Sequence, residues 1–123
     1  MKEYIDLEFP NKMAKEKKRR IVSTKILVYA NMRRCGKSML LAICDAELLG
    51  KVLRDGKIVF EVREKFYRGK KMSSEEAIDL VGQSTIVNMI GHHIIQEALE
   101  RNLIHPEAIL KISGIPHAQI VKI

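Results

Sequence analysis

Basic and aromatic side chains are interleaved in residues 63–71, which read REKFYRGKK. Lysine and arginine can pair with phosphate oxygens, and an aromatic ring offers a stacking surface to an unpaired base. The alternative is that Phe66 and Tyr67 anchor the segment in the core while the charges only solvate a connection. We expect Phe66 to be buried, and for Tyr67 both alternatives stay open. The candidate RNA-binding residues of this segment are Arg63, Lys65, Tyr67, Arg68, Lys70 and Lys71.

A second basic cluster, residues 33–37, reads RRCGK and is predicted to form a polar turn. Its candidate RNA-binding residues are Arg33, Arg34 and Lys37. The GKS sequence at positions 36–38 also resembles the end of a phosphate-binding P-loop, so a P-loop-like nucleotide binder is a distant alternative. A P-loop needs a glycine five residues before Gly36, where backbone amides cradle the phosphate, and Asn31 stands there. The turn of a hairpin is therefore the preferred interpretation.

The segment 114–119, which reads GIPHAQ, is expected to be a loop of defined shape. Glycine permits a positive φ, and proline fixes its own φ and restricts the residue before it. The loop would present His117 and Gln119, whose side chains can both donate and accept hydrogen bonds. A base edge, a ribose hydroxyl or a carboxylate could be bound in this way. The alternative is a structural turn in which His117 satisfies backbone carbonyls at the end of a sheet.

A polar stripe is predicted on a long helix over residues 75–102. Asn88, His92 and Gln96 follow one another at four-residue spacing and would share one face of that helix. We name Asn88 and His92 as candidate ligand or partner contacts. The favoured alternative is a hydrated or partly buried polar seam, and the adjacent pair His92-His93 lacks the spacing of a metal site.

Catalytic and metal-binding patterns are weak in this sequence. No nucleophile in a Ser–His–Asp order stands out, and no pair of carboxylates lies in an apolar setting that would shift its pKa. Cys35 and Cys44 have no further ligands at zinc-binding spacing beside them, so we expect two free thiols. We therefore predict no enzyme activity, no cofactor and no metal site.

Apolar patterns in the first half predict the elements that position the basic segments. Residues 26–29 and 39–44 are predicted to pair as a β-hairpin. Asp45 is expected to cap a short helix over residues 46–53. Alternation over residues 58–62 predicts a third strand.

The second half is predicted to contain one long helix and two short strands. Ser73 and Glu76 form a capping box, which opens the helix over residues 75–102, and a break or bend is expected near Gly82. The two strands are predicted over residues 109–112 and 119–123.

The resulting order is β-β-α-β-α-β-β, which indicates an α+β fold. We expect a small mixed or antiparallel sheet that helices cover on one face. Residues 24–123 are predicted to be a single globular domain. Residues 1–23 are predicted to be a basic N-terminal arm, with disorder as one alternative.

The charge balance favours a polyanionic partner. The 123 residues include 22 Lys and Arg against 15 Asp and Glu, a formal net charge of +7. Such an excess promotes binding to RNA through release of phosphate counterions, although many small proteins are basic for solubility alone. No apolar run approaches the ~20 residues of a membrane span, and no signal-peptide core is visible. We expect a cytoplasmic protein that binds neither membranes nor specific DNA sequences.

Three segments carry a resemblance to a known family: residues 44–51 (CDAELLGK), 66–69 (FYRG) and 114–119 (GIPHAQ). In this order and spacing they resemble the small archaeal family called "domain of unknown function 424" (DUF424), and the resemblance covers about residues 24–123. Asn88 and Gly91 look like family positions as well. The N-terminal arm departs from the family pattern, and the basic turn is longer than the family leads us to expect. The resemblance implies an archaeal cytosolic protein associated with RNA binding or translation, in a family that is largely uncharacterised.

These observations favour a non-catalytic RNA-binding or ribosome-associated accessory protein, in which the two basic segments and the arm neutralise phosphates. The second alternative is a protein-interaction adaptor in translation or RNA processing, which presents the His117 loop to its partner. A small-molecule enzyme is a distant third. Salt dependence separates the first two, because RNA binding weakens steeply with salt and an apolar protein interface does not.

Overall fold

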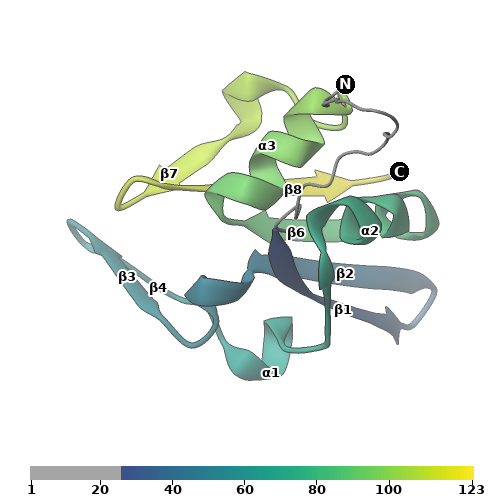
Figure 1. The fold of residues 1–123 in the computed structure, drawn as a ribbon, viewed down its shortest axis with the longest axis horizontal. Coiled ribbons are helices and arrows are strands. Elements are labelled where there is room, and N and C mark those ends of the chain that lie inside the picture. Colours follow the sequence, from purple (N-terminus) through teal and green to yellow (C-terminus); the bar gives the residue numbers. More distant parts are fainter. Residues whose placement is uncertain (1–25) are drawn as a thin grey trace, which may run out of the picture.

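The computed structural model describes residues 26–123, so the predicted N-terminal arm lies outside the described residues (Figure 1). The main element is a mixed six-stranded sheet with the strand order β5-β1-β2-β6-β8-β7. Neighbouring strands pair antiparallel except for β2 and β6, which are parallel. The strands of this sheet are β1 (Leu27–Cys35), β2 (Ser38–Asp45), β5 (Lys70–Ser73), β6 (Ile86–Ile90), β7 (Leu110–Ile112) and β8 (Ile115–Val121).

Two helices cover one face of this sheet, and a small hairpin lies on the other face (Figure 1). The helices are α2 (Ser74–Asp79) and α3 (His92–Glu100). The opposite face carries the one-turn helix α1 (Glu64–Tyr67) and the hairpin of β3 (Val52–Asp55) and β4 (Ile58–Glu61). Short 3₁₀ turns lie at Ala46–Leu48, Leu80–Gln83 and Pro106–Ala108. The predicted α+β class, with helices on one face of a mixed sheet, is confirmed, but the order is β-β-β-β-α-β-α-β-α-β-β.

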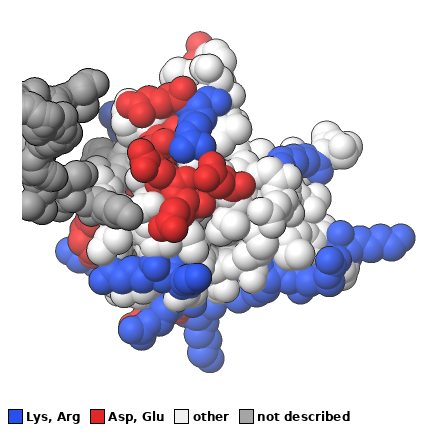
Figure 2. Space-filling model, turned by 45° about the vertical axis from the view of Figure 1, so that its right-hand side comes forward, with Lys and Arg blue, Asp and Glu red and all other residues white. Residues whose placement is uncertain are grey.

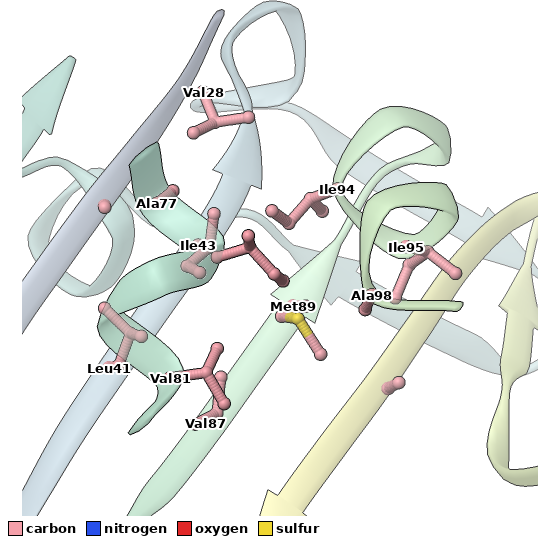
Figure 3. Packing of buried hydrophobic residues seen from close by; sticks show 13 residues of the cluster. Val28, Leu41, Ile43, Ala77, Val81, Val87, Met89, Ile94, Ile95 and Ala98 are labelled. Atoms are coloured by element: carbon pink, nitrogen blue, oxygen red, sulfur yellow. The ribbon is translucent and has the colours of Figure 1, made fainter. Parts of the chain in front are cut away.

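The main hydrophobic core lies between the sheet and the two helices (Figure 3). Successive side chains of a strand point to opposite faces, so Ile43 of β2 and Met89 of β6 both point to the helix side. There they pack with Ile94 and Ala98 of α3, and all four are fully buried. Tight packing of this kind fixes α2 and α3 on the sheet and leaves the opposite face as the place for a site.

The first two strands form the predicted β-hairpin. Cys35 pairs with Ser38, and the chain reverses at Gly36-Lys37. Arg33 and Arg34 therefore belong to strand β1 and not to the turn, which corrects the prediction. The GKS sequence leads into strand β2, whereas a P-loop leads into a helix whose N-terminus binds phosphate. The GKS sequence therefore does not form a P-loop.

The capping box of Ser73 and Glu76 is confirmed and opens α2. In the segment predicted as a helix over residues 75–102, the interruption expected near Gly82 is present, but the prediction that the helix resumes directly after it is wrong. That segment contains α2, a 3₁₀ turn, strand β6 and α3. β6 lies inside the sheet, where Met89 faces the helices and Ile90 belongs to a buried cluster on the other face. A strand that is buried on both faces forms a continuous apolar run, which imitates the spacing of an amphipathic helix.

The helix predicted after Asp45 is also wrong, because a 3₁₀ turn forms there and the chain continues into β3. The Asp45 carboxylate caps α3 instead. Its Oδ2 accepts a hydrogen bond from the backbone amide of His93 at 2.9 Å, and its Oδ1 accepts one from the amide of Ile94 at 3.0 Å. Gly91 permits this contact, since a Cβ there would overlap the Asp45 side chain and its φ is +128°. Asp45 thus joins the end of β2 to a helix 48 residues further along the chain.

Candidate functional site

A cavity of about 850 Å³ opens on the face of the sheet opposite α2 and α3. Asn88 lies two residues before Ile90 on β6, and His117 of β8 pairs with Ile90, so both side chains are on this face. The β4 strand and the α1 segment form the walls above them. The lining residues are Arg33, Gly50, Phe60, Glu61, Arg63, Glu64, Lys65, Phe66, Tyr67, Asn88 and His117.

The cavity brings together candidates that the sequence places in separate segments. Six of the predicted contact residues line it: Arg33, Arg63, Lys65, Tyr67, Asn88 and His117. The parallel pairing of β2 with β6, and the pairing of β6 with β8, carry the later residues next to the β1–β2 hairpin. Basic, aromatic and hydrogen-bonding groups therefore share one concave surface, which is the usual form of a ligand site.

Polar side chains form part of the floor of the cavity, at one level of the paired strands. Asn88 stands between Ala42 of β2 and Gln119 of β8 in the strand register. Its side chain is half-buried, and no hydrogen bond from it to another group is found within residues 26–123. Asn31, at the same level, donates through Nδ2 to the carbonyl of Phe66 at 3.0 Å and so attaches the α1 segment to β1. Among the described residues, Asn88 is thus left as an unpaired donor and acceptor beneath the cavity.

His117 lies on strand β8 and not on the predicted loop, since the chain turns earlier, at Ser113-Gly114. Its ring makes an edge contact with Phe60, with ring centroids 5.3 Å apart and planes at 62°. Burial lowers the pKa of His117 below its ordinary value of 6.5, because a charged imidazole would lose hydration. Across the described part of the chain its ring has no hydrogen-bonding partner, so the proposed pairing with backbone carbonyls is not observed.

The two aromatic residues of α1 settle one open alternative and correct one expectation, because Tyr67 is the buried ring and Phe66, expected to be buried, is not fully so. Tyr67 is 2% exposed and belongs to the buried cluster under the cavity, while Phe66 is half-buried. Their rings meet edge to face with centroids 4.9 Å apart. Burial, with a smaller contribution from the nearby Cys44 thiol, raises the pKa of Tyr67 far above its ordinary value. Tyr67 is therefore a core anchor, and Phe66 is the ring that keeps an accessible surface.

The two basic segments predicted from the sequence lie side by side. β5 pairs with β1, and Gly69 allows the close approach because a Cβ there would overlap the backbone of Ala30. The Arg33 guanidinium lies 5.2 Å from the centre of the Phe66 ring, and its Nη1 donates to the carbonyl of Lys65 at 3.3 Å. Segments 33–37 and 63–71 together hold eight of the fourteen Lys and Arg in residues 26–123, and one acid.

Acidic residues are distributed differently over the surface. Figure 2 shows a face on which Lys and Arg follow the lower edge while Asp and Glu gather in the upper part. On the helix side, Arg101 pairs with Asp79 of α2 at 2.8 Å and with Glu97 of α3 at 3.3 Å. Near the cavity, Glu64 pairs with Arg68 at 2.9 Å. The positive surface of β1, α1 and β5 is thus only partly neutralised by acids beside it.

Seven predicted contact residues do not line the cavity. Arg34, Lys37, Arg68, Lys70 and Lys71 are exposed outside the cavity. Gln119 is exposed beside Asn88 on the same face of the sheet, and His92 is exposed at the start of α3. The polar stripe of Asn88, His92 and Gln96 does not form, because Asn88 belongs to a strand and the other two to α3.

Five further cavity residues are not among the predicted contacts. Glu64 and Phe66 lie within the predicted basic segment 63–71, whereas Gly50, Phe60 and Glu61 lie outside every segment that holds predicted contacts. The strand that carries Phe60 was expected, and β4 confirms it. The sequence prediction misses the pairing of this strand with β3. Asp55-Gly56 is typical of a tight β-hairpin turn, but the prediction takes it as the end of a helix. A hydrogen bond from the amide of Ser113 to Asp55 Oδ2, at 2.8 Å, holds this hairpin at the β7–β8 turn.

In the described part of the chain, one group of side chains could hold a metal ion, with ligand atoms of Asp45, Glu47 and His93 within 4.8 Å of one another. However, both carboxylate oxygens of Asp45 already accept amide hydrogen bonds from α3, and His93 Nδ1 lies 3.1 Å from one of them. The positive end of the α3 dipole also opposes a cation at this position. The group is therefore explained by its role as the cap of α3.

Comparison with known proteins identifies the family. The family model "Protein of unknown function (DUF424)" matches residues 32–123, and the chain belongs to this family. A crystal structure of an uncharacterized conserved protein from Methanopyrus kandleri has a similar fold, with a TM-score of 0.68 and 25% sequence identity. The similarity covers 76% of this chain and 90% of that chain. No curated protein matches the sequence, and none of the helices within residues 26–123 is long and apolar enough to span a membrane.

Proposed function

We propose that this DUF424 protein is a non-catalytic RNA-binding protein that acts as an accessory factor of translation or the ribosome. The supporting observation is that two basic segments, separate in the sequence, are adjacent on β1, α1 and β5 and border a cavity with aromatic walls. Of the eight cations in these segments, Arg33, Arg63 and Lys65 line the cavity, and Lys71 lies on the same face of the sheet beside Tyr29. A positive region of this kind is what a phosphate backbone requires.

Binding would begin with exposed cations that pair with phosphate oxygens. Lys70 and Lys71 lie on β5, the edge strand of the sheet, and both are exposed. Lys71 also lies 5.7 Å from the centre of the Tyr29 ring, which limits the directions its ammonium group can take. Each phosphate contact releases counterions, so affinity should fall steeply as salt concentration rises.

The test is an RNA titration at several salt concentrations with a charge-reversed variant. Lys70→Glu with Lys71→Glu should weaken binding to a single-stranded RNA and reduce the slope of log affinity against log salt by about 1.4, or 0.7 for each lost phosphate contact. The matched control is Lys57→Glu with Lys111→Glu. It makes the same change of net charge, but Lys111 lies on β7, at the opposite edge of the sheet. Equal losses in the two variants, or no salt dependence at all, would exclude this surface as the RNA site.

A protein-interaction adaptor is the second candidate. The structure weakens its original basis, because His117 lines a cavity and is not presented by a loop. A different observation favours it: Val52, Ile58 and Val59 of the β3–β4 hairpin are about half exposed. Binding of a protein partner that is insensitive to salt and is lost in Val59→Asp would favour the adaptor.

The source and location of the protein remain part of the proposal. An archaeal source is supported by the structural similarity to a protein from Methanopyrus kandleri. A cytoplasmic location follows from the proposed partners, because RNA and ribosomes are found there.

A further inference from the structure

We infer that the cavity holds the base of one unpaired nucleotide while the adjoining cations bind the phosphates on either side of it. This inference rests on the proposed RNA-binding function and adds a preference for single strands. Four observations carry it: the position of the aromatic residues, the unpaired polar groups on the floor, the placement of acid and base around the walls, and the fixed geometry of Arg33.

Aromatic residues are concentrated at the cavity. Within residues 26–123 the aromatic side chains are Tyr29, Phe60, Phe66 and Tyr67, and the last three line it. Phe60 and Phe66 are half-buried, so each keeps part of its ring accessible from the cavity. Stacking on such rings is the main attraction that proteins offer to an unpaired base, and every base has a face that can stack.

The floor offers hydrogen bonds that no group of the described chain uses. The Asn88 amide and the His117 imidazole are half-buried, line the cavity and have no side-chain hydrogen bond within residues 26–123. Half-buried polar groups usually have a partner, and each of these two can both donate and accept. The edge of a nucleobase also carries donors and acceptors side by side, which makes it a fitting partner.

The charges around the cavity favour a base over a phosphate as the group that occupies it. Glu61 lines the wall, and its carboxylate would repel an anion but can accept a hydrogen bond from a base N–H. Arg63 lies beside it, with Nε 3.7 Å from Glu61 Oε1. Lys65 and Arg33 complete the cationic part of the lining. A neutral, planar base inside the cavity, with its phosphates outside and away from Glu61, therefore fits better than free phosphate or a carboxylate.

Arg33 is held in place before any ligand binds. Its guanidinium lies over the Phe66 ring and donates to the Lys65 carbonyl, so its side chain loses little freedom when it meets a phosphate. A double helix keeps its bases stacked and paired, and none of them could enter the cavity. The combination of a stacking wall with fixed cations therefore predicts a preference for unpaired RNA.

The test uses the histidine ring signals in NMR spectra and three RNA probes. The chain has four histidines, and of these His117 lines the cavity whereas His92, His93 and His105 do not. The probes are a short oligoadenylate, a strand of equal length with abasic residues, and an RNA duplex with the same number of phosphates. We expect the oligoadenylate to shift the His117 signals and to bind about tenfold more tightly than the abasic strand, since stacking contributes about 1–3 kcal/mol per base. The duplex should leave His117 unchanged.

Variants supply a second measurement. Asn88→Ala should reduce affinity for the oligoadenylate by about fivefold or more, on the order of one lost base contact, and leave affinity for the abasic strand unchanged. Phe66→Leu should reduce affinity for the oligoadenylate at least as much, and should weaken the abasic strand less, because Arg33 loses its ring contact but keeps its hydrogen bond to the Lys65 carbonyl. Phe66→Leu keeps an apolar side chain, so the fold is preserved while the stacking surface is lost. The matched control is Gln83→Ala, which removes an exposed amide from the 3₁₀ turn after α2.

The outcomes distinguish this inference from the proposed function. If the abasic strand binds as tightly as the oligoadenylate and His117 does not respond, the base pocket is wrong while RNA binding through the cationic surface stands. If neither strand binds at low salt, the proposed function itself fails.

Discussion

The two faces of the six-stranded sheet are built from the same strands but differ in how completely they are covered. On the helix side, thirteen buried residues form one core in which sheet and helices contribute apolar side chains. On the other side, the buried cluster has six residues: Ala42, Cys44, Leu48, Val62, Tyr67 and Ile90. The remaining area on that side carries Asn31, Asn88 and His117 and opens into the cavity.

Because successive side chains of a strand point to opposite faces, residues that stabilise the core and residues that could bind a ligand can be neighbours on the same strand. Met89 and Asn88 are neighbours on β6, yet one is fully buried under α3 and the other lines the cavity. The helices close their face, whereas a four-residue helix and a two-stranded hairpin cover the other face only in part. A polar residue on the second face therefore keeps access to a ligand without loss of core packing.

The largest expected effect is a loss of stability that depends on which face is mutated. Met89→Ala should lower the free energy of unfolding by about 2–5 kcal/mol, because it leaves a void in a packed core. Asn88→Ala should cost less than about 1 kcal/mol, because its amide makes no hydrogen bond to the described chain. Urea denaturation of both variants measures the difference. Similar losses would mean that the two faces are packed alike in solution and that the cavity is closed there.

The second prediction concerns the residue that fixes a helix on the closed face. Asp45→Ala should lower the free energy of unfolding by about 1–3 kcal/mol, since two buried amides of α3 lose their acceptor. Asp45→Asn keeps one acceptor oxygen and should lose less. Glu47→Ala, an exposed neighbour, should stay within about 0.5 kcal/mol of the wild type. If Asp45→Asn were as stable as the wild type, the negative charge would contribute nothing to the cap.

The sequence predicts correctly those elements whose structure depends on residues close together in the chain. The β1–β2 hairpin, the strand over β4 and the capping box of Ser73 and Glu76 are local patterns, and all three are confirmed. The mixed sheet with helices on one face is confirmed as well. The family resemblance quoted on residues 44–51, 66–69 and 114–119 agrees with the match over residues 32–123.

The errors arise where a distant partner decides the structure. The sequence predicts a helix over β6 because apolar side chains stand on both of its faces, and its parallel partner β2 lies 46 residues earlier, as in the pair Ala42–Asn88. Asp45 has the residue type of a local cap but its amide donors are 48 and 49 residues away. The cavity could not be predicted for the same reason. Its predicted residues belong to four separate segments of the sequence, and only the strand order brings these segments together.

The smallest expected effect is a change with pH on the open face. Burial lowers the pKa of His117, so the unfolded chain binds a proton more readily than the folded one as pH falls below 6.5. Stability should therefore decline as pH drops through 6.5 and stop declining, for this residue, below the folded pKa. His117→Gln removes the titration and keeps a hydrogen-bonding side chain.

The measurement is the urea midpoint of wild type and His117→Gln between about pH 7.5 and about pH 5, the range in which histidines titrate. The groups that share the cavity with His117 act in both directions, since Glu61 and Glu64 favour its charged form while Arg33, Arg63 and Lys65 oppose it. Contributions from the other histidines cancel in the difference between the two proteins. A wild-type midpoint that falls more than that of the variant agrees with a ring that is neutral when folded. A smaller fall in the wild type would mean that the acids dominate, and that the open face binds ligands with a charged imidazole.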